Sequence, residues 1–333
     1  MATKKKRNTA SHKQARVAKP GKFCAMPQLP ERQFAPGVTP GRASLIVTSA
    51  KKWVNGTRLH YCFLRTPAGF KGSDAHLDKV REAFDAWKKL GIGLSFQEVD
   101  EASEAEIRIG FLSGDGHWSY IGRDVLGYGA HERTMNLDKA DSWGLDTAIH
   151  EIGHSLGLPH EHQNPNAGIV WDEEAVYAAL AGPPNHWSRA KTFHNIIRKI
   201  NPDTVQGSSW DPDSVMHYPF EPGLINEPLK YRNGLNPKGG LSPRDREWIR
   251  VFYPPLDDGK LKRLRPFRSE RLTLQPTQQV DFAIEPEDTR SYTVATFGQS
   301  DAVLVLFEDV DGAPRYVTGD DDSGEDCNAS IQV

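Results

Sequence analysis

Cysteine is scarce in this chain of 333 residues, which contains only Cys24, Cys62 and Cys327. An odd number of widely spaced cysteines provides no framework of disulfides, so we expect a packed core to supply most of the stability. No apolar run approaches the length of about 18 residues that suggests a membrane span, and none is expected. The basic N-terminus is followed by no apolar segment, so we recognise no secretory signal peptide.

A large net charge is also missing. Lys and Arg number 41 against 44 for Asp and Glu, and the formal net charge is -3, so composition points to neither a nucleic-acid nor a membrane partner. The charge is nevertheless uneven, because residues 1–22 are basic and contain no acidic residue. We interpret residues 1–42 as a disordered basic tail or a pro-segment. A nucleic-acid-binding patch is the alternative for this tail.

Hydrophobic periodicity predicts the secondary structure that follows. Apolar residues at helical spacing, with Asp74 as N-cap, indicate a helix over residues 74–90. A β-hairpin is predicted from residues 45–47 and 53–64, around the turn signal Asn55-Gly56. The other predicted strands are rich in apolar residues and cover 92–99, 107–112 and 134–137. The other predicted helices have start or stop signals at their ends and cover 147–156, 172–180 and 244–252.

The sequence contains one dense string of metal-ligand residues: His150-Glu151-Ile152-Gly153-His154-Ser155-Leu156-Gly157-Leu158-Pro159-His160. Histidines at positions i and i+4 of a helix face one point, and zinc accepts neutral imidazole well. Gly157 can adopt a positive φ, which would turn the chain back and bring His160 to the same metal. Three such ligands leave one position open for water, as in catalytic zinc sites.

Glu151 follows the first of these histidines and is too constrained to be a fourth ligand. Beside the open position it is placed to act as the general base that takes a proton from the metal-activated water. The alternative is a group of histidines that binds no metal. We consider the complete string too specific for that interpretation.

The string matches HExxHxxGxxH, and residues 45–255 resemble the metzincin zinc endopeptidases. Glu161, directly after it, resembles the astacin family within the metzincins. In astacins this residue belongs to a buried network that receives the mature N-terminus, which implies a structural role here. A solvated loop residue is the alternative. The resemblance implies an α+β metzincin domain over residues 43–255, with two lobes, a twisted mostly parallel sheet and an active-site helix.

A second motif, Ser214-Val215-Met216-His217-Tyr218, is similar to the astacin Met-turn. The resemblance implies that Met216 packs beneath the zinc ligands and that His217 is not a ligand. It also implies that Tyr218 is associated with the metal and can swing to donate a hydrogen bond to the oxyanion. Leu158-Pro159 replaces the aromatic residue usual before the third histidine, which puts the substrate preference in question rather than the metal chemistry.

Cys24 lies within the predicted pro-segment, in Lys22-Phe23-Cys24-Ala25-Met26-Pro27. A thiolate there could cap the open zinc position and keep the enzyme latent, and the string loosely resembles cysteine-switch zymogens. The alternative is a free cysteine in a tail.

Residues 256–265 are a predicted linker, and period-two alternation predicts an all-β module over 266–333. This module resembles the bacterial prepeptidase C-terminal domain, a small β-sandwich of secreted peptidases, and looks incomplete. Its acidic run Asp320–Asp322 is a candidate for Ca2+ binding, with a solvated turn as the alternative. The resemblance favours an extracellular location, although no signal peptide is present in the sequence.

We therefore predict an endopeptidase for protein or peptide substrates, with one catalytic Zn2+. The substrate is expected to pair as an extra strand on the sheet edge, near residues 107–112. The alternatives are a zinc protein that does not cut, a surface-binding protein that acts through its C-terminal module, and a nucleic-acid binder that acts through the tail. The sequence predicts no particular oligomeric state.

Overall fold

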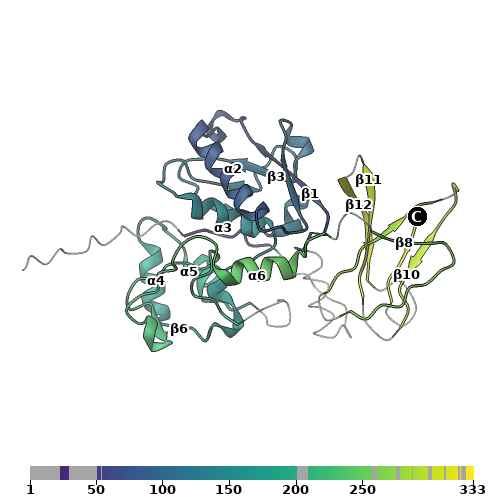
Figure 1. The fold of residues 1–333 in the computed structure, drawn as a ribbon. Helices are drawn as coiled ribbons and strands as arrows, with labels where there is room; N and C mark the ends of the chain where they lie inside the picture. The colour runs from purple at the N-terminus through teal and green to yellow at the C-terminus, as the bar shows by residue number, and fades with distance from the viewer. Residues whose placement is uncertain are drawn as a thin grey trace, which may run out of the picture.

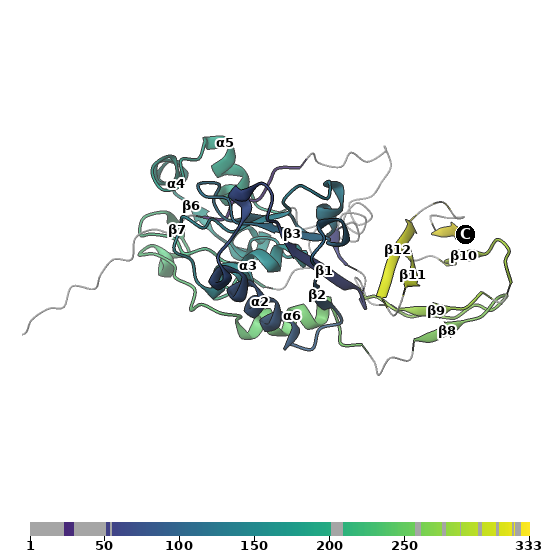
Figure 2. The same ribbon diagram turned by 90° about the horizontal axis from the view of Figure 1, so that it is seen from above.

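The computed structural model shows an α+β body up to residue 256 and a group of β-strands from residue 261 on, lying side by side (Figures 1 and 2). Of the tail or pro-segment predicted over 1–42, only residues 23–29 are described; the predicted strand over 45–47 and Cys327 also lie outside the described residues. The description covers residues 23–29, 51–53, 55–200, 209–256, 261–274, 278–286, 288–298, 302–310, 313–321, 323 and 328–333.

A five-stranded sheet with the order β2-β1-β3-β5-β4 forms the centre of the α+β body. Its strands are β1 (Arg58–Phe63), β2 (Ser95–Glu98), β3 (Ile107–Gly110), β4 (Trp118–Ser119) and β5 (Met135–Asn136). All neighbouring pairs are parallel except β4 with β5. The mostly parallel sheet expected for this part is confirmed.

One expectation about this sheet is wrong, and another is not met within the described residues, since residues 45–47 lie outside them. The strand β1 lies between β2 and β3 and pairs in parallel with both, so the predicted hairpin is absent from the described residues. The turn at Gly56, with a φ of 95°, instead leads into β1. The strand β3, which was expected to offer an edge to substrate, is interior, and the edge strands are β2 and β4.

Two helices, α2 (Asp74–Lys88) and α3 (Leu145–Ser155), pack together and share the core with the sheet in the upper half of Figure 1. The α2 helix buries Val80, Phe84 and Trp87, the residues whose helical spacing predicted it. Its N-cap is Ser73 rather than Asp74, because the Ser73 side chain accepts a hydrogen bond from the amide of His76.

The lower half of Figure 1 holds α4 (Glu173–Ala181), α5 (Arg189–Thr192) and the pair β6 (Val170–Trp171) with β7 (Ile225–Glu227). A π-helical turn covers Phe193–Ile197. The helix α6 (Pro243–Phe252) begins with Ser242 as N-cap and a proline in its first turn, as predicted. The 3-10 turns are Ala68–Phe70, Ala102–Glu104, Gly122–Gly127, Glu161–Gln163, Pro165–Ala167 and Leu229–Tyr231.

The regular structure described from residue 261 on consists of β-strands that pair two by two. They are β8 (Lys262–Leu264) with β9 (Phe282–Ile284), β10 (Thr293–Ala295) with β13 (Ser330–Gln332), and β11 (Leu304–Val310) with β12 (Ala313–Asp320). The assembly of these strands into a prepeptidase-like sandwich stays a prediction. Within the described part of the chain, no helix has the length and apolar character needed to cross a membrane.

Candidate active site

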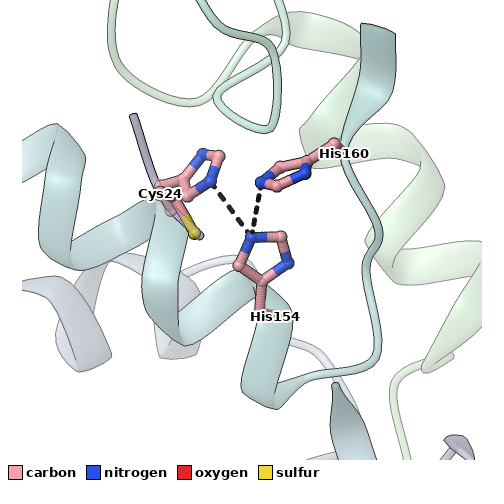
Figure 3. A group of neighbouring side chains, drawn as sticks. Cys24, His154 and His160 are labelled. Atoms are coloured by element: carbon pink, nitrogen blue, oxygen red, sulfur yellow. Dashed lines mark hydrogen bonds between the residues drawn. The ribbon is translucent and has the colours of Figure 1, made fainter. Parts of the chain in front are cut away.

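The helix α3 and the turn after it bring three imidazoles together. The Nε2 atom of His154 lies 3.1 Å from Nε2 of His150 and 3.1 Å from Nε2 of His160. Figure 3 shows the rings of His154 and His160 converging, with the sulfur of Cys24 beside them. Nitrogens bound tetrahedrally to zinc at about 2.0–2.1 Å would lie roughly 3.3 Å apart. The spacing of these three nitrogens therefore fits a zinc ion.

Backbone carbonyls fix the orientation of two of these rings. Nδ1 of His150 donates to the carbonyl of Val215 at 2.8 Å, and Nδ1 of His154 donates to the carbonyl of Leu158 at 2.7 Å. Burial lowers the pKa of His150 to about 4 and lowers the pKa values of His154 and His160 well below their usual range. Neutral rings with a proton on Nδ1 present the lone pair of Nε2, as a metal ligand must.

Glycines allow the chain to pass close to itself at this site. A Cβ atom at Gly153 would lie 2.5 Å from Sδ of Met216, so the helix contacts the predicted Met-turn directly. Gly157 has a φ of 96° and turns the chain after α3 towards His160. The amide of Glu161 then donates to the carbonyl of Met216 at 2.9 Å, which joins this segment to the Met-turn.

Glu151 is fully buried beside these histidines. Burial raises its pKa to about 8, while a hydrogen bond from Cys24 Sγ to Oε2, at 3.4 Å, lowers it. Its other oxygen, Oε1, has no hydrogen-bond partner among the described residues. A buried carboxyl group with one unpaired oxygen is suited to exchange a proton with water or substrate.

Cys24 reaches the same point from the distant segment 23–29. Its Sγ and one nitrogen of each of the three histidines lie within 4.8 Å of one another. Burial raises the pKa of the Cys24 thiol well above its usual value, and the charge of Glu151 raises it further. The chain therefore places a thiol sulfur beside the histidines, where the sequence had left open both a cap on the metal and a free cysteine in a tail.

Tyr218 lies between Cys24 and His160. Its hydroxyl contacts Nε2 of His160 and donates to the carbonyl oxygen of Cys24 at 2.7 Å. The neighbouring His217 is not part of the group that could hold a metal, and its Nδ1 donates to the carbonyl of Tyr218 at 2.7 Å. The site thus contains Tyr218, as the motif implied, while the Nδ1 of His217 is taken up by the backbone.

Sequence reasoning missed Asp245. Its Oδ1 accepts from Ser214 Oγ at 2.6 Å, and its Oδ2 accepts from the amide of Val215 at 2.8 Å. It also completes the capping box of α6 with Ser242. The capping-box pattern in the sequence was a local signal for a helix start. Nothing in the sequence showed that the Asp245 carboxylate also holds the Met-turn.

Glu161 is partly buried next to this network. Its Oε1 accepts from the amide of Asp211 at 2.9 Å and from Nδ2 of Asn164 at 3.1 Å. Burial raises its pKa to about 7, and these hydrogen bonds lower it. A solvated loop residue does not fit these contacts, while its role towards a mature N-terminus stays a prediction.

Comparisons with known proteins agree with this geometry. A model of the matrixin family matches residues 52–169. The chain is 38% identical to metalloendoproteinase 1-MMP of Arabidopsis thaliana over 104 residues, which cover 25% of this chain and 28% of that protein. It is 35% identical to a hatching enzyme of Paracentrotus lividus over 129 residues, which cover 34% of this chain and 22% of that protein.

The solved structure of myroilysin is also similar, with a TM-score of 0.55 and 30% identity. That similarity covers 62% of this chain and 97% of the other. The chain spans less than half the length of the curated relatives named above.

Proposed function

Because the chain belongs to the metzincin family of zinc metalloendopeptidases, we propose that it hydrolyses internal peptide bonds of proteins at one zinc ion. The observation that carries this proposal is the convergence of the Nε2 atoms of His150, His154 and His160 beside the buried Glu151. A zinc ion bound there acidifies water and polarises the scissile carbonyl.

The residues around the ligands have distinct roles in this proposal. Glu151 accepts a proton from the attacking water and passes it to the leaving amine, which its unpaired Oε1 supports. Tyr218 already donates to a backbone carbonyl, that of Cys24, next to His160. A substrate carbonyl in the same place would receive the same hydrogen bond, and this bond would strengthen as an oxyanion forms.

We propose that the described form is latent. The Cys24 thiolate would complete a closed set of three imidazoles and one sulfur, which resembles a structural zinc site rather than a catalytic one. A bound dication favours the thiolate over the thiol, so it would offset the pKa-raising effect of burial. Cys24 is 4% exposed, which supports the cap over a free cysteine in a tail.

The segment 23–29 also supports a proposal for where an extended substrate would bind. The amide of Ala25 donates to the carbonyl of His117, directly before the edge strand β4, at 3.1 Å. We propose that an extended substrate pairs with this edge, rather than with β3 as the sequence suggested. The resemblance of residues 266–333 to modules of secreted peptidases supports action outside the cell. No calcium site is proposed: Oδ2 of Asp320 accepts from the amides of Ser323 and Ser330, and Asp322 lies outside the described residues.

Casein hydrolysis by the zinc-loaded protein, with zinc content measured alongside, tests the proposal. We expect slow hydrolysis by the wild type, faster hydrolysis by Cys24→Ala, and none by the double variant Cys24→Ala/Glu151→Gln. All three are expected to hold about one zinc ion. Bound zinc without hydrolysis in Cys24→Ala would favour a zinc protein that does not cut. Equal rates for the wild type and Cys24→Ala would contradict latency alone.

A further inference from the structure

We propose that the active enzyme prefers an aromatic substrate side chain beside the scissile bond, bound in the pocket that Phe23 now occupies. This inference rests on the proposed peptidase function and names a substrate class for it. The pocket walls are the rings of Trp187, Tyr218 and Phe220.

The Phe23 ring makes specific contacts with all three walls. Its centroid lies 5.0 Å from that of Tyr218 in an edge-to-face arrangement, and 5.8 Å from that of Phe220 with an interplanar angle of 29°. The third wall, Trp187, lies 6.2 Å away. Edge-to-face and offset-stacked geometries favour an aromatic ring over an aliphatic chain of similar size.

The pocket lies directly beside the metal ligands. Tyr218 contacts both Phe23 and His160, and Cys24, the next residue after Phe23, reaches the three histidines. A side chain in this pocket therefore belongs to a residue next to the group at the metal. In a substrate, that group is the scissile peptide bond.

The backbone hydrogen bonds of this segment do not select side chains. The amide of Phe23 donates to Oδ1 of Asn185 at 2.9 Å, and the carbonyl of Cys24 accepts from Tyr218 at 2.7 Å. The amide of Ala25 donates to the carbonyl of His117 at 3.1 Å. An extended peptide of almost any sequence can make these three backbone bonds. Selectivity must therefore come from side-chain contacts such as those around Phe23.

The walls are also buried while Phe23 is in place. Trp187 is 6% exposed and Phe220 is 3% exposed. Departure of the segment would uncover an aromatic surface next to the active site. A substrate ring of similar shape would cover that surface again, with the gain in free energy that apolar burial provides.

The test uses the zinc-loaded full chain carrying Phe23→Ala and Cys24→Ala, which removes both the cap and the occupant of the pocket. Two quenched peptides would be compared, identical except for Phe or Ala beside the cleaved bond, with both sides of the bond tried in turn. We expect kcat/KM about tenfold to a hundredfold higher for the Phe peptide on one side. Adding Trp187→Ala should bring the ratio of the two kcat/KM values close to one and leave kcat/KM for the Ala peptide nearly unchanged.

Phe193→Ala is the matched control, because Phe193 is an exposed aromatic residue that is not among the rings described around Phe23. Its ratio should equal that of the parent. Hydrolysis of both peptides at equal rates would overturn the aromatic pocket while the peptidase function stands. Hydrolysis of neither peptide, nor of casein, would overturn the peptidase function itself.

A second measurement needs no change in the pocket. The peptide Phe-Cys-Ala-Met-Pro, which copies residues 23–27, should inhibit casein hydrolysis by the same enzyme. Replacement of its Phe by Ala should weaken inhibition about tenfold or more. The same loss is expected in a second pair of peptides that carry Ser in place of Cys. Equal inhibition by the Phe and Ala peptides would contradict the pocket, even if Trp187→Ala had failed to fold.

Discussion

Val215 and His150 are joined by a hydrogen bond from Nδ1 of the imidazole to the backbone carbonyl, 2.8 Å long. The amide of the same Val215 donates to Asp245 Oδ2, also at 2.8 Å. One residue of the Met-turn thus connects the first candidate metal ligand to the first turn of α6. The orientation of His150 depends on a carboxylate that lies 95 positions further along the chain.

Replacement of Asp245 should weaken zinc binding without touching a ligand. Asp245→Ala removes the acceptor for Ser214 and Val215, so the carbonyl that orients His150 is held less firmly. We expect affinity for zinc to fall about 10-fold to 100-fold, as for other outer partners of metal ligands. Competition with a chromogenic chelator measures this. Glu247→Ala, on the exposed face of the same helix, is the control. Equal zinc affinity in both variants would show that Asp245 does not act on His150 through Val215.

A methyl group at Gly153 should disturb the floor of the site. The added Cβ would lie 2.5 Å from Met216 Sδ and 3.3 Å from the Trp87 ring, so both neighbours must shift. Overpacking of this kind costs about 1–3 kcal/mol, and we expect Gly153→Ala to lose that much stability in urea unfolding. Gly127→Ala is the comparison, because a Cβ there meets no atom within 4 Å. Similar losses for both variants would show that the contact with Met216 is not the cause.

The hydroxyl of Tyr253 should stabilise the C-terminal end of α3. It donates to the carbonyl of Leu156 at 2.8 Å and accepts from the amide of Trp53 at 3.1 Å. Tyr253→Phe leaves both buried backbone groups without this partner, and we expect a loss of about 1–3 kcal/mol in thermal unfolding. Tyr231→Phe serves as control, since its hydroxyl makes none of the hydrogen bonds described. An unchanged melting temperature for Tyr253→Phe would contradict the prediction.

Glu161 should make the stability of the metal-free protein depend on pH. Burial raises its pKa to about 7, above the value of about 4.3 for an unfolded chain, so the folded state binds the proton more tightly. The contribution of Glu161 to the free energy of unfolding is complete below about pH 4 and is lost as the pH rises to about 7. We expect the melting temperature of the wild type to fall more than that of Glu161→Gln between about pH 4.5 and 7.5. Parallel pH profiles by calorimetry would exclude this assignment.

Local patterns predicted the parts of the site that are local in the chain. The candidate ligands His150, His154 and His160 span one helix and one turn, so their spacing alone brought them together. The apolar spacing in α2 and the start of α6 at Ser242-Pro243 were predicted for the same reason. The N-cap of α2 was placed one residue late, because Asp74 and Ser73 are both good caps and only the backbone bond to His76 decides between them.

Pairings between distant segments could not be predicted. The edge strand β4 has two residues, too few to show an alternating pattern. Residues 107–112 gave a clearer strand pattern and were expected to form the edge, but the strand β3 there is interior. The position of a strand within a sheet depends on its partners rather than on its own residues. The link from Asp245 to the Met-turn and the seating of Phe23 against Trp187 have the same origin.

The sequence by itself determined the convergence of three imidazoles that could hold a metal, because one helical turn and one glycine suffice to bring them to a point. It also identified Glu151, which the same helix places beside them. Only the tertiary structure decided what surrounds that centre. Packing of segments that are more than 100 residues apart buried Cys24 among the ligands and enclosed Phe23 in aromatic rings. Such contacts depend on how the whole chain folds, and no local pattern encodes them.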